Sequence, residues 1–164
     1  MTILVKNKHT LQIDEFKFQC CIGKKGSTNN KKEGDKKSPK GTFQIENLYF
    51  REDRIKKPLT LLKCIKIKKN MGWCDDISFP KKYNKLIKID KKIRHEKLKR
   101  KDNKYDLLIP IKYNFNKPIT GKGSCIFIHL TKNYQPTAGC IALKKRDFLI
   151  MLKLINKDST IKIF

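Results

Sequence analysis

The segment Gly123–Leu143, which reads GSCIFIHLTKNYQPTAGCIAL, constrains the fold more than any other part of the chain. Its apolar side chains between residues 126 and 130 follow the two-residue period of a buried strand. This alternation places His129 on the strand face opposite the isoleucines. After a short loop, residues 131–136, a glycine precedes Cys140. The segment therefore predicts a buried strand, a loop and a sharp turn that presents a cysteine.

Cys140, Gly139 and His129 together supply the parts of a cysteine acyl-transfer site. Gly139 removes a side chain beside the cysteine, so a substrate carbonyl can approach the backbone N–H groups of Gly139 and Cys140. We expect these groups to stabilise an oxyanion and His129 to take the thiol proton as general base. The alternative is a core thiol and a buried strand histidine, which suits either residue taken alone. Their combination with the glycine turn favours catalysis.

Two sequence signatures resemble those of the L,D-transpeptidase (YkuD-type) catalytic domain of bacterial cell-wall enzymes. Thr137–Cys140, TAGC, is similar to the Ser/Thr-x-Gly-Cys turn that follows a strand histidine in that family. Upstream, Glu33–Phe43, EGDKKSPKGTF, resembles its Gly-Asp…Thr/Ser-Pro-x-Gly-x-Phe signature. Gly72–Asp76 and Arg94–Glu96 are similar to marks of a compact one-domain branch. The resemblance covers nearly the whole chain.

The resemblance implies a single catalytic domain over residues 1–164 with a mainly β fold. The expected architecture is a β-sandwich with a mixed sheet, one helix near the C-terminus and the active cleft at one edge. Short apolar runs independently predict strands at residues 3–5, 11–13, 16–22, 42–50, 59–67, 105–113 and 160–164. Pro110 marks its strand as an edge or bulged strand. Residues 145–156 instead show the i, i+3, i+4, i+7 spacing of a helix.

The resemblance also implies a reaction, with no cofactor and no metal. Cys140 would attack the carbonyl that follows the L-centre of diaminopimelate in a peptidoglycan tetrapeptide stem or muropeptide, and the terminal D-alanine would leave. The acyl-enzyme would then pass to an amine, forming a crosslink, or to water. A backbone carbonyl would orient His129. Ala138 and Ala142 depart from the histidine and the Arg or Asn common in the family, so other residues must anchor the substrate.

Three further residues are expected to line the substrate cleft, namely Trp73, His95 and Thr137. Trp73 can instead be a core aromatic beside a turn, and His95, inside a basic run, can instead be solvated surface. The basic loop of residues 23–41 is either mobile and solvated or, as the resemblance implies, ordered in its second half. In the ordered loop we expect Asp35 to be structural rather than catalytic.

The net charge of +25 raises a second function class, a non-enzymatic basic module that binds nucleic acid. Only five of the 40 basic residues are arginine, and lysine lacks the planar fork that base-edge recognition favours. The aromatic residues do not gather in the basic runs either. Compositional bias is the simpler explanation for the lysines, so we expect nucleic acid not to be the partner.

The six cysteines and the first residues bear on the compartment. No CxxC pair or His-x₃₋₅-His spacing indicates a zinc site, and no apolar run reaches transmembrane length. Residues 1–6, MTILVK, are too short an apolar start for a signal peptide. We therefore expect a cytoplasmic protein with reduced thiols, whereas the resembled family is commonly periplasmic or wall-associated. A cytoplasmic location would favour an L,D-carboxypeptidase that recycles stem peptides.

Overall fold

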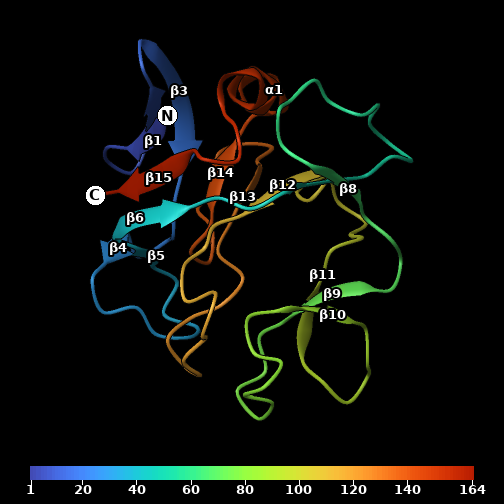
Figure 1. Cartoon of the computed structure of the whole chain (residues 1–164). Coiled ribbons are helices and arrows are strands. Elements are labelled where there is room, and N and C mark those ends of the chain that lie inside the picture. Colours follow the sequence, from blue (N-terminus) through green and yellow to red (C-terminus); the bar gives the residue numbers. More distant parts are fainter.

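The computed structural model describes residues 1–164. The protein is organised around one sheet of ten strands (Figure 1). The strands run in the order β6-β15-β1-β2-β3-β14-β13-β12-β7-β8. Their bounds are β1 Thr2–Val5, β2 Thr10–Ile13, β3 Phe16–Cys21, β6 Gly41–Gln44, β7 Leu48–Phe50, β8 Cys64–Lys66, β12 Leu107–Pro110, β13 Phe127–Leu130, β14 Ile141–Leu143 and β15 Thr160–Ile163. The sheet is mixed, because the pairs β1–β15, β13–β14 and β7–β8 are parallel and the others antiparallel.

The sheet curls so that its two halves share one core. The antiparallel pair β3–β14 joins the halves, and an isolated bridge between Ile45 and Ile111 brings the chain after β6 against the end of β12. A cluster of 26 buried residues, which we call the main core, draws side chains from both halves. The expectation of a mainly β fold with a mixed sheet and one C-terminal helix is confirmed.

The single helix, α1 (Lys145–Leu154), follows β14 and packs near β13 (Figure 1). It buries Phe148, Met151 and Leu152 in the main core, as their spacing predicts. Asp147 in the first turn and a lysine in the last complement the helix dipole. The helix ends at Leu154 rather than at residue 156. No helix in the chain has the length and apolar character needed to cross a membrane.

A separate antiparallel sheet, in the order β10-β9-β11, packs beside the main sheet (Figure 1). Its strands are β9 Met71–Cys74, β10 Leu86–Lys88 and β11 His95–Lys97. Between the two sheets lies a smaller cluster of eight buried residues, which we call the aromatic cluster. Its members are Tyr49, Ile67, Trp73, Leu98, Tyr105, Leu108, Phe127 and Cys140.

The basic loop of residues 23–41 is ordered along its length. Two short strands within it, β4 (Ser27–Thr28) and β5 (Ser38–Pro39), pair in parallel. Asp35 accepts hydrogen bonds from two backbone N–H groups of the same loop, each at 2.9 Å. The structural role expected for Asp35 is therefore borne out by its contacts.

Two strand predictions were wrong in detail. The run 59–67 forms a strand only over β8, because only those residues pair with β7, and Leu59 and Leu61 are each 78% exposed. Of the two alternatives for Pro110, an edge strand or a bulged strand, the edge is wrong, since β12 lies between β13 and β7. Pro110 is the last residue of β12, beyond the positions that pair with β7, so its missing N–H removes no bond on that side.

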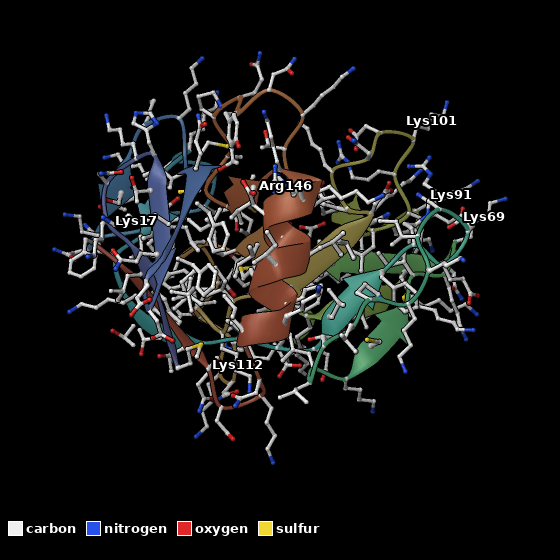
Figure 2. All side chains as sticks on the ribbon, turned by 90° about the horizontal axis from the view of Figure 1, so that it is seen from above. Lys17, Lys69, Lys91, Lys101, Lys112 and Arg146 are labelled. Atoms are coloured by element: carbon white, nitrogen blue, oxygen red, sulfur yellow. The ribbon has the colours of Figure 1, made fainter.

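Basic side chains surround the molecule rather than gathering on one face. Figure 2 shows Lys69, Lys91 and Lys101 at one side of the molecule, Lys17 toward the opposite side and Arg146 over the helix between them. With a formal net charge of +25, most of this charge has no acidic partner in the chain. The arrangement favours solubility and general attraction of anions over a specific basic groove.

Candidate active site

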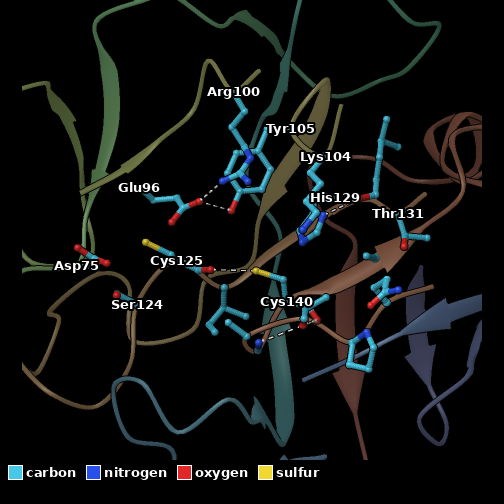
Figure 3. Close-up of a pocket in the computed structure, with 18 of the residues that line it drawn as sticks. Asp75, Glu96, Arg100, Lys104, Tyr105, Ser124, Cys125, His129, Thr131 and Cys140 are labelled. Carbon is cyan, nitrogen blue, oxygen red and sulfur yellow. Dashed lines mark hydrogen bonds and ion pairs between the residues drawn. The ribbon is translucent and has the colours of Figure 1, made fainter. Parts of the chain in front are cut away.

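A cavity of about 620 Å³ opens beside β13 and the turn that precedes β14 (Figure 3). His129, Cys140, Gly139 and Thr137 all line it. The pairing of β13 with β14, in which His129 lies opposite Ala142, brings the histidine next to the cysteine turn. The structure thus assembles in one cavity the residues that the sequence predicted to form the core of the site.

Cys140 immediately precedes β14 and is 8% exposed. Its thiol donates to the backbone carbonyl of Cys125, with 3.1 Å between Sγ and O, and accepts from the N–H of Phe127 at 3.4 Å. Burial raises the pKa of the Cys140 thiol to about 12, although the Phe127 N–H acts in the opposite direction. In this environment Cys140 therefore holds a neutral thiol near pH 7, not a thiolate.

His129 lies on β13 with its ring fixed by two neighbours. Its Nδ1 is 2.8 Å from the carbonyl oxygen of Leu130, and because a carbonyl only accepts, Nδ1 carries the proton. Nε2 is then left with a free lone pair. The Tyr105 ring packs edge-on against the imidazole at a centroid distance of 5.3 Å. Burial lowers the pKa of His129 to about 4, so the ring is neutral near pH 7.

The thiol and the imidazole line the same cavity without a hydrogen bond between them. In Figure 3 the dashed line from Cys140 runs to Cys125, while His129 is bonded to the main chain. Direct transfer of the thiol proton to Nε2 therefore requires the Cys140 side chain to leave the Cys125 carbonyl. Catalytic hydrogen bonds are often absent from an empty site and form only with substrate bound.

The turn before Cys140 can be formed only by glycine at position 139. Gly139 has φ +147°, and a Cβ there would lie 2.8 Å from the carbonyl oxygen of Lys37. The Thr137 hydroxyl closes the turn, since it accepts from the Gly139 N–H at 3.0 Å and donates to the Cys140 carbonyl at 2.6 Å. Of the two amides expected to bind an oxyanion, Gly139 N–H is thus engaged, whereas Cys140 N–H has no acceptor in the protein.

A charged wall of the cavity was not predicted from the sequence. Glu96 accepts hydrogen bonds from Arg100 at 2.7 Å and from the Tyr105 hydroxyl at 3.1 Å. The Arg100 guanidinium also lies over the Tyr105 ring, 5.0 Å from its centroid. Figure 3 shows this group and Asp75 on the Cys125 side, and Lys104 on the His129 side. The four-residue spacing of Glu96 and Arg100 gives no valid signal for the pair, because that spacing brings side chains together on a helix and Glu96 lies on β11.

Trp73 and His95, expected to line the cleft, do not reach the cavity. Trp73 is buried in the aromatic cluster, and its indole N–H donates to Asn84 at 2.9 Å. His95 has Nδ1 2.6 Å from the Ile93 carbonyl and packs against Gly72. Because side chains alternate along β11, Glu96 faces the cavity and His95 faces away. Of these three residues, only Thr137 lies at the site.

The basic loop forms another wall of the cavity. Lys31 is 5% exposed, and its ammonium group donates to Asp35 at 2.7 Å and to the Lys32 carbonyl at 2.8 Å. Glu33 accepts hydrogen bonds from the hydroxyls of Tyr83 and Ser124. The bond from Ser124 ties the loop to the segment that leads into β13. In the whole chain, no group of three or more His, Cys, Asp and Glu side chains is placed to hold a metal ion.

Comparison with known protein families identified the domain to which the chain belongs. A family model described as YkuD, L,D-transpeptidase catalytic domain, matches residues 1–163. No curated protein and no solved structure matches the chain. The matched region contains both predicted signatures and every element of the cavity.

Proposed function

Because the chain belongs to the YkuD family of L,D-transpeptidase catalytic domains, we propose that it is a cysteine acyl-transfer enzyme acting on peptidoglycan tetrapeptide stems. The observation that carries the proposal is the arrangement around Cys140. Cys140, which has an unpartnered backbone N–H, and His129, a neutral imidazole with a free Nε2, line one cavity. Cys140 is the nucleophile in this proposal, and His129 is the general base.

The first half-reaction forms an acyl-enzyme. His129 Nε2 takes the Cys140 proton as Sγ attacks the stem carbonyl, and the oxygen of the tetrahedral intermediate accepts from the Cys140 N–H. The imidazolium then donates the proton to the departing nitrogen. D-alanine leaves with an uncharged amino group, and a thioester remains on Cys140. The Leu130 carbonyl supports this cycle because it keeps Nδ1 protonated throughout.

The protonation states at rest decide which kind of cysteine mechanism applies. A pKa of Cys140 raised to about 12 and a pKa of His129 lowered to about 4 both oppose a preformed thiolate–imidazolium pair. Proton transfer is therefore coupled to substrate attack, as in general base catalysis, rather than completed beforehand. Charged groups of a bound peptide change the electrostatic environment and can lower the free energy needed to form the thiolate–imidazolium pair.

The acyl-enzyme has two fates. Attack by an amine gives a crosslink, which is transpeptidation, and attack by water gives a tripeptide, which is the L,D-carboxypeptidase reaction. His129 can serve both, because it is free to take a proton from either acceptor once D-alanine has left. The charged wall of Glu96 and Arg100 lines the same cavity as Cys140 and His129.

The test is mass spectrometry of purified protein with a tetrapeptide stem, with and without an amine acceptor. We expect loss of D-alanine with the intact chain and none with Cys140→Ala. Cys125→Ala is the matched control, because Cys125 is a second thiol that lines the same cavity. A crosslinked dimer would identify transpeptidation, and a free tripeptide would identify hydrolysis. Loss of D-alanine from Cys140→Ala would contradict the proposal.

A further inference from the structure

The peptide unit between Gly139 and Cys140 is fixed by a residue far away in the sequence. Ser38, on β5, is fully buried and donates its hydroxyl hydrogen to the Gly139 carbonyl, with 2.7 Å between Oγ and O. The two residues are 101 positions apart. Ser38 Oγ in turn accepts from the Gly23 N–H at 3.0 Å. The Ser38 hydroxyl therefore accepts one hydrogen bond, from Gly23, and donates one, to Gly139.

This bond sets the direction of the Cys140 N–H. The carbonyl and the N–H of one trans peptide point in opposite directions, and the chain has no cis peptide bonds. With the Gly139 carbonyl held against Ser38, the Cys140 N–H points away from β5. The Thr137 hydroxyl occupies the Gly139 N–H and the Cys140 carbonyl. The Cys140 N–H is thus the one polar backbone group of these two residues that the protein leaves unpartnered.

The contact depends on close approach between backbones. A Cβ at Gly139 would lie 2.8 Å from the Lys37 carbonyl oxygen, and a Cβ at Gly23 would lie 2.7 Å from that of Lys36 and 2.8 Å from Ser38 N. Both glycines therefore allow the chain at β5 to reach the turn before Cys140. Asp35 stiffens this chain, because it accepts from the Lys37 N–H at 2.9 Å.

We infer that Ser38 is a positioning residue whose hydroxyl orients and polarises the Gly139–Cys140 peptide so that the Cys140 N–H binds the oxyanion. A donor on the carbonyl end strengthens the N–H of the same peptide as a donor, by roughly 10–30% per bond. A fixed donor also needs no reorganisation when charge develops on the substrate oxygen. This inference rests on the proposed function, and Ser38 acts without touching the substrate.

The test compares Ser38→Ala with a matched loss of a buried hydroxyl elsewhere. Ser159 is also fully buried and accepts from the Asn156 N–H at 2.9 Å, but it lies outside the cavity. We expect Ser38→Ala to lower kcat for D-alanine release about tenfold or more, with KM little changed. Complete loss of an oxyanion donor lowers kcat by a factor of about 10²–10³, and misalignment of the donor lowers it by less. Ser159→Ala should keep the wild-type kcat. Ser38→Thr, which keeps the hydroxyl, should restore most of the rate.

A spectroscopic measurement separates positioning from general loosening. The carbonyl stretch of an acyl-enzyme made from a ¹³C-labelled stem reports the hydrogen bond to its oxygen. We expect the stretch to move to higher frequency in Ser38→Ala and to return in Ser38→Thr, because the bond from Cys140 N–H weakens only in the former. Should Ser38→Ala fail to fold, Ser38→Cys serves instead, with a weak donor of similar shape and an intermediate shift.

The outcomes distinguish this inference from the proposed function. Wild-type kcat and an unshifted stretch in Ser38→Ala, with Cys140→Ala inactive, would overturn the inference alone. A slow Ser38→Ala that shows no shift in the stretch and is not rescued by Ser38→Thr would also overturn it, because the role would then be structural. D-alanine release that survives Cys140→Ala would overturn both.

Discussion

The two faces of β13 carry different kinds of residue. Ile128 and Leu130 enter the main core, which is largely aliphatic. Phe127 enters the aromatic cluster, in which four of eight members are Tyr, Trp or Phe, and His129 borders the cavity beside it. Adjacent positions of one four-residue strand thus serve stability and chemistry separately. Substitutions at adjacent positions of β13 should therefore affect either the unfolding free energy or the reaction rate, but not both equally.

The aromatic side is also connected differently. Phe127 meets Trp73 edge-on at a centroid distance of 5.3 Å and Tyr105 at 5.8 Å, and Tyr105 meets His129 at 5.3 Å. These contacts link the small sheet to the imidazole through rigid rings. Such edge-to-face pairs contribute about 0.5–1.5 kcal/mol each beyond the area that they bury. The aliphatic side reaches the cavity only through Ile126 and Leu130, main-core residues that line it directly.

The largest expected effect is on the reaction rate and comes from the β13 face that carries His129. His129→Gln should lower the rate of D-alanine release by about 10²- to 10⁴-fold, because Gln offers no base at the position of Nε2. The unfolding free energy should change little by comparison, since Gln keeps a polar group near the Leu130 carbonyl. Release rates and urea unfolding measure the two quantities. A rate within tenfold of wild type would remove His129 from the mechanism.

The next effect tests the opposite face of the same strand. Ile128→Ala should cost about 2–5 kcal/mol of unfolding free energy, because Ile128 is fully buried in the main core. The folded fraction should still release D-alanine at close to the wild-type rate. Urea unfolding and rates corrected for folded protein provide the measurement. Ile128→Val is the milder control, at about 0.5–1.5 kcal/mol. An unchanged stability would contradict the separation of the faces.

A pH dependence of stability should follow from the buried imidazole. The pKa of His129 is lowered to about 4 in the folded protein, against about 6.5 when unfolded, so the unfolded state binds more protons between these values. Stability should therefore fall as pH drops from about 6.5 to 4, by about 1.4 kcal/mol per pH unit from this group. Thermal unfolding across this range measures it. The slope should shrink in His129→Gln, and an identical slope would contradict the assignment.

The smallest effect tests whether the aromatic cluster contacts substrate. Trp73→Phe removes the indole N–H bond to Asn84 and should cost about 1 kcal/mol of stability. KM should stay near the wild-type value, because Trp73 does not line the cavity. Steady-state kinetics beside urea unfolding tests both parts. A tenfold rise in KM would show that Trp73 takes part in substrate binding after all.

Local patterns were sufficient to predict the centre of the site. Alternation along β13 gave the face of His129, helical spacing gave α1, and Gly139 marked the turn before Cys140. Each of these follows from residues close together in the sequence. The prediction of a strand over residues 59–67 was too long because a strand also needs a partner, and within that run only residues 64–66 pair with β7.

The other parts of the site depend on contacts between distant segments. Ser38 could not be connected to Gly139 from the sequence, because their bond spans 101 positions. The choice between His95 and Glu96 depended on the pairing of β11 with β9, and side chains at adjacent positions face opposite sides. The sequence allowed Trp73 to be either a cleft residue or a core aromatic. Its burial in the aromatic cluster depends on how the small sheet packs, which local patterns do not reveal.

The position of β15 has a consequence for how the chain is made. This strand, Thr160–Ile163, lies between β6 and β1, so residues from the two ends of the chain pair directly, as Thr2 does with Thr160. On the ribosome, that half of the sheet cannot close until β15 has emerged, and the edges of β1 and β6 stay open to other chains meanwhile. Pairing at such sequence separation is also slow. The nascent protein therefore depends on β15 to complete this half of the sheet and to cover the edges of β1 and β6.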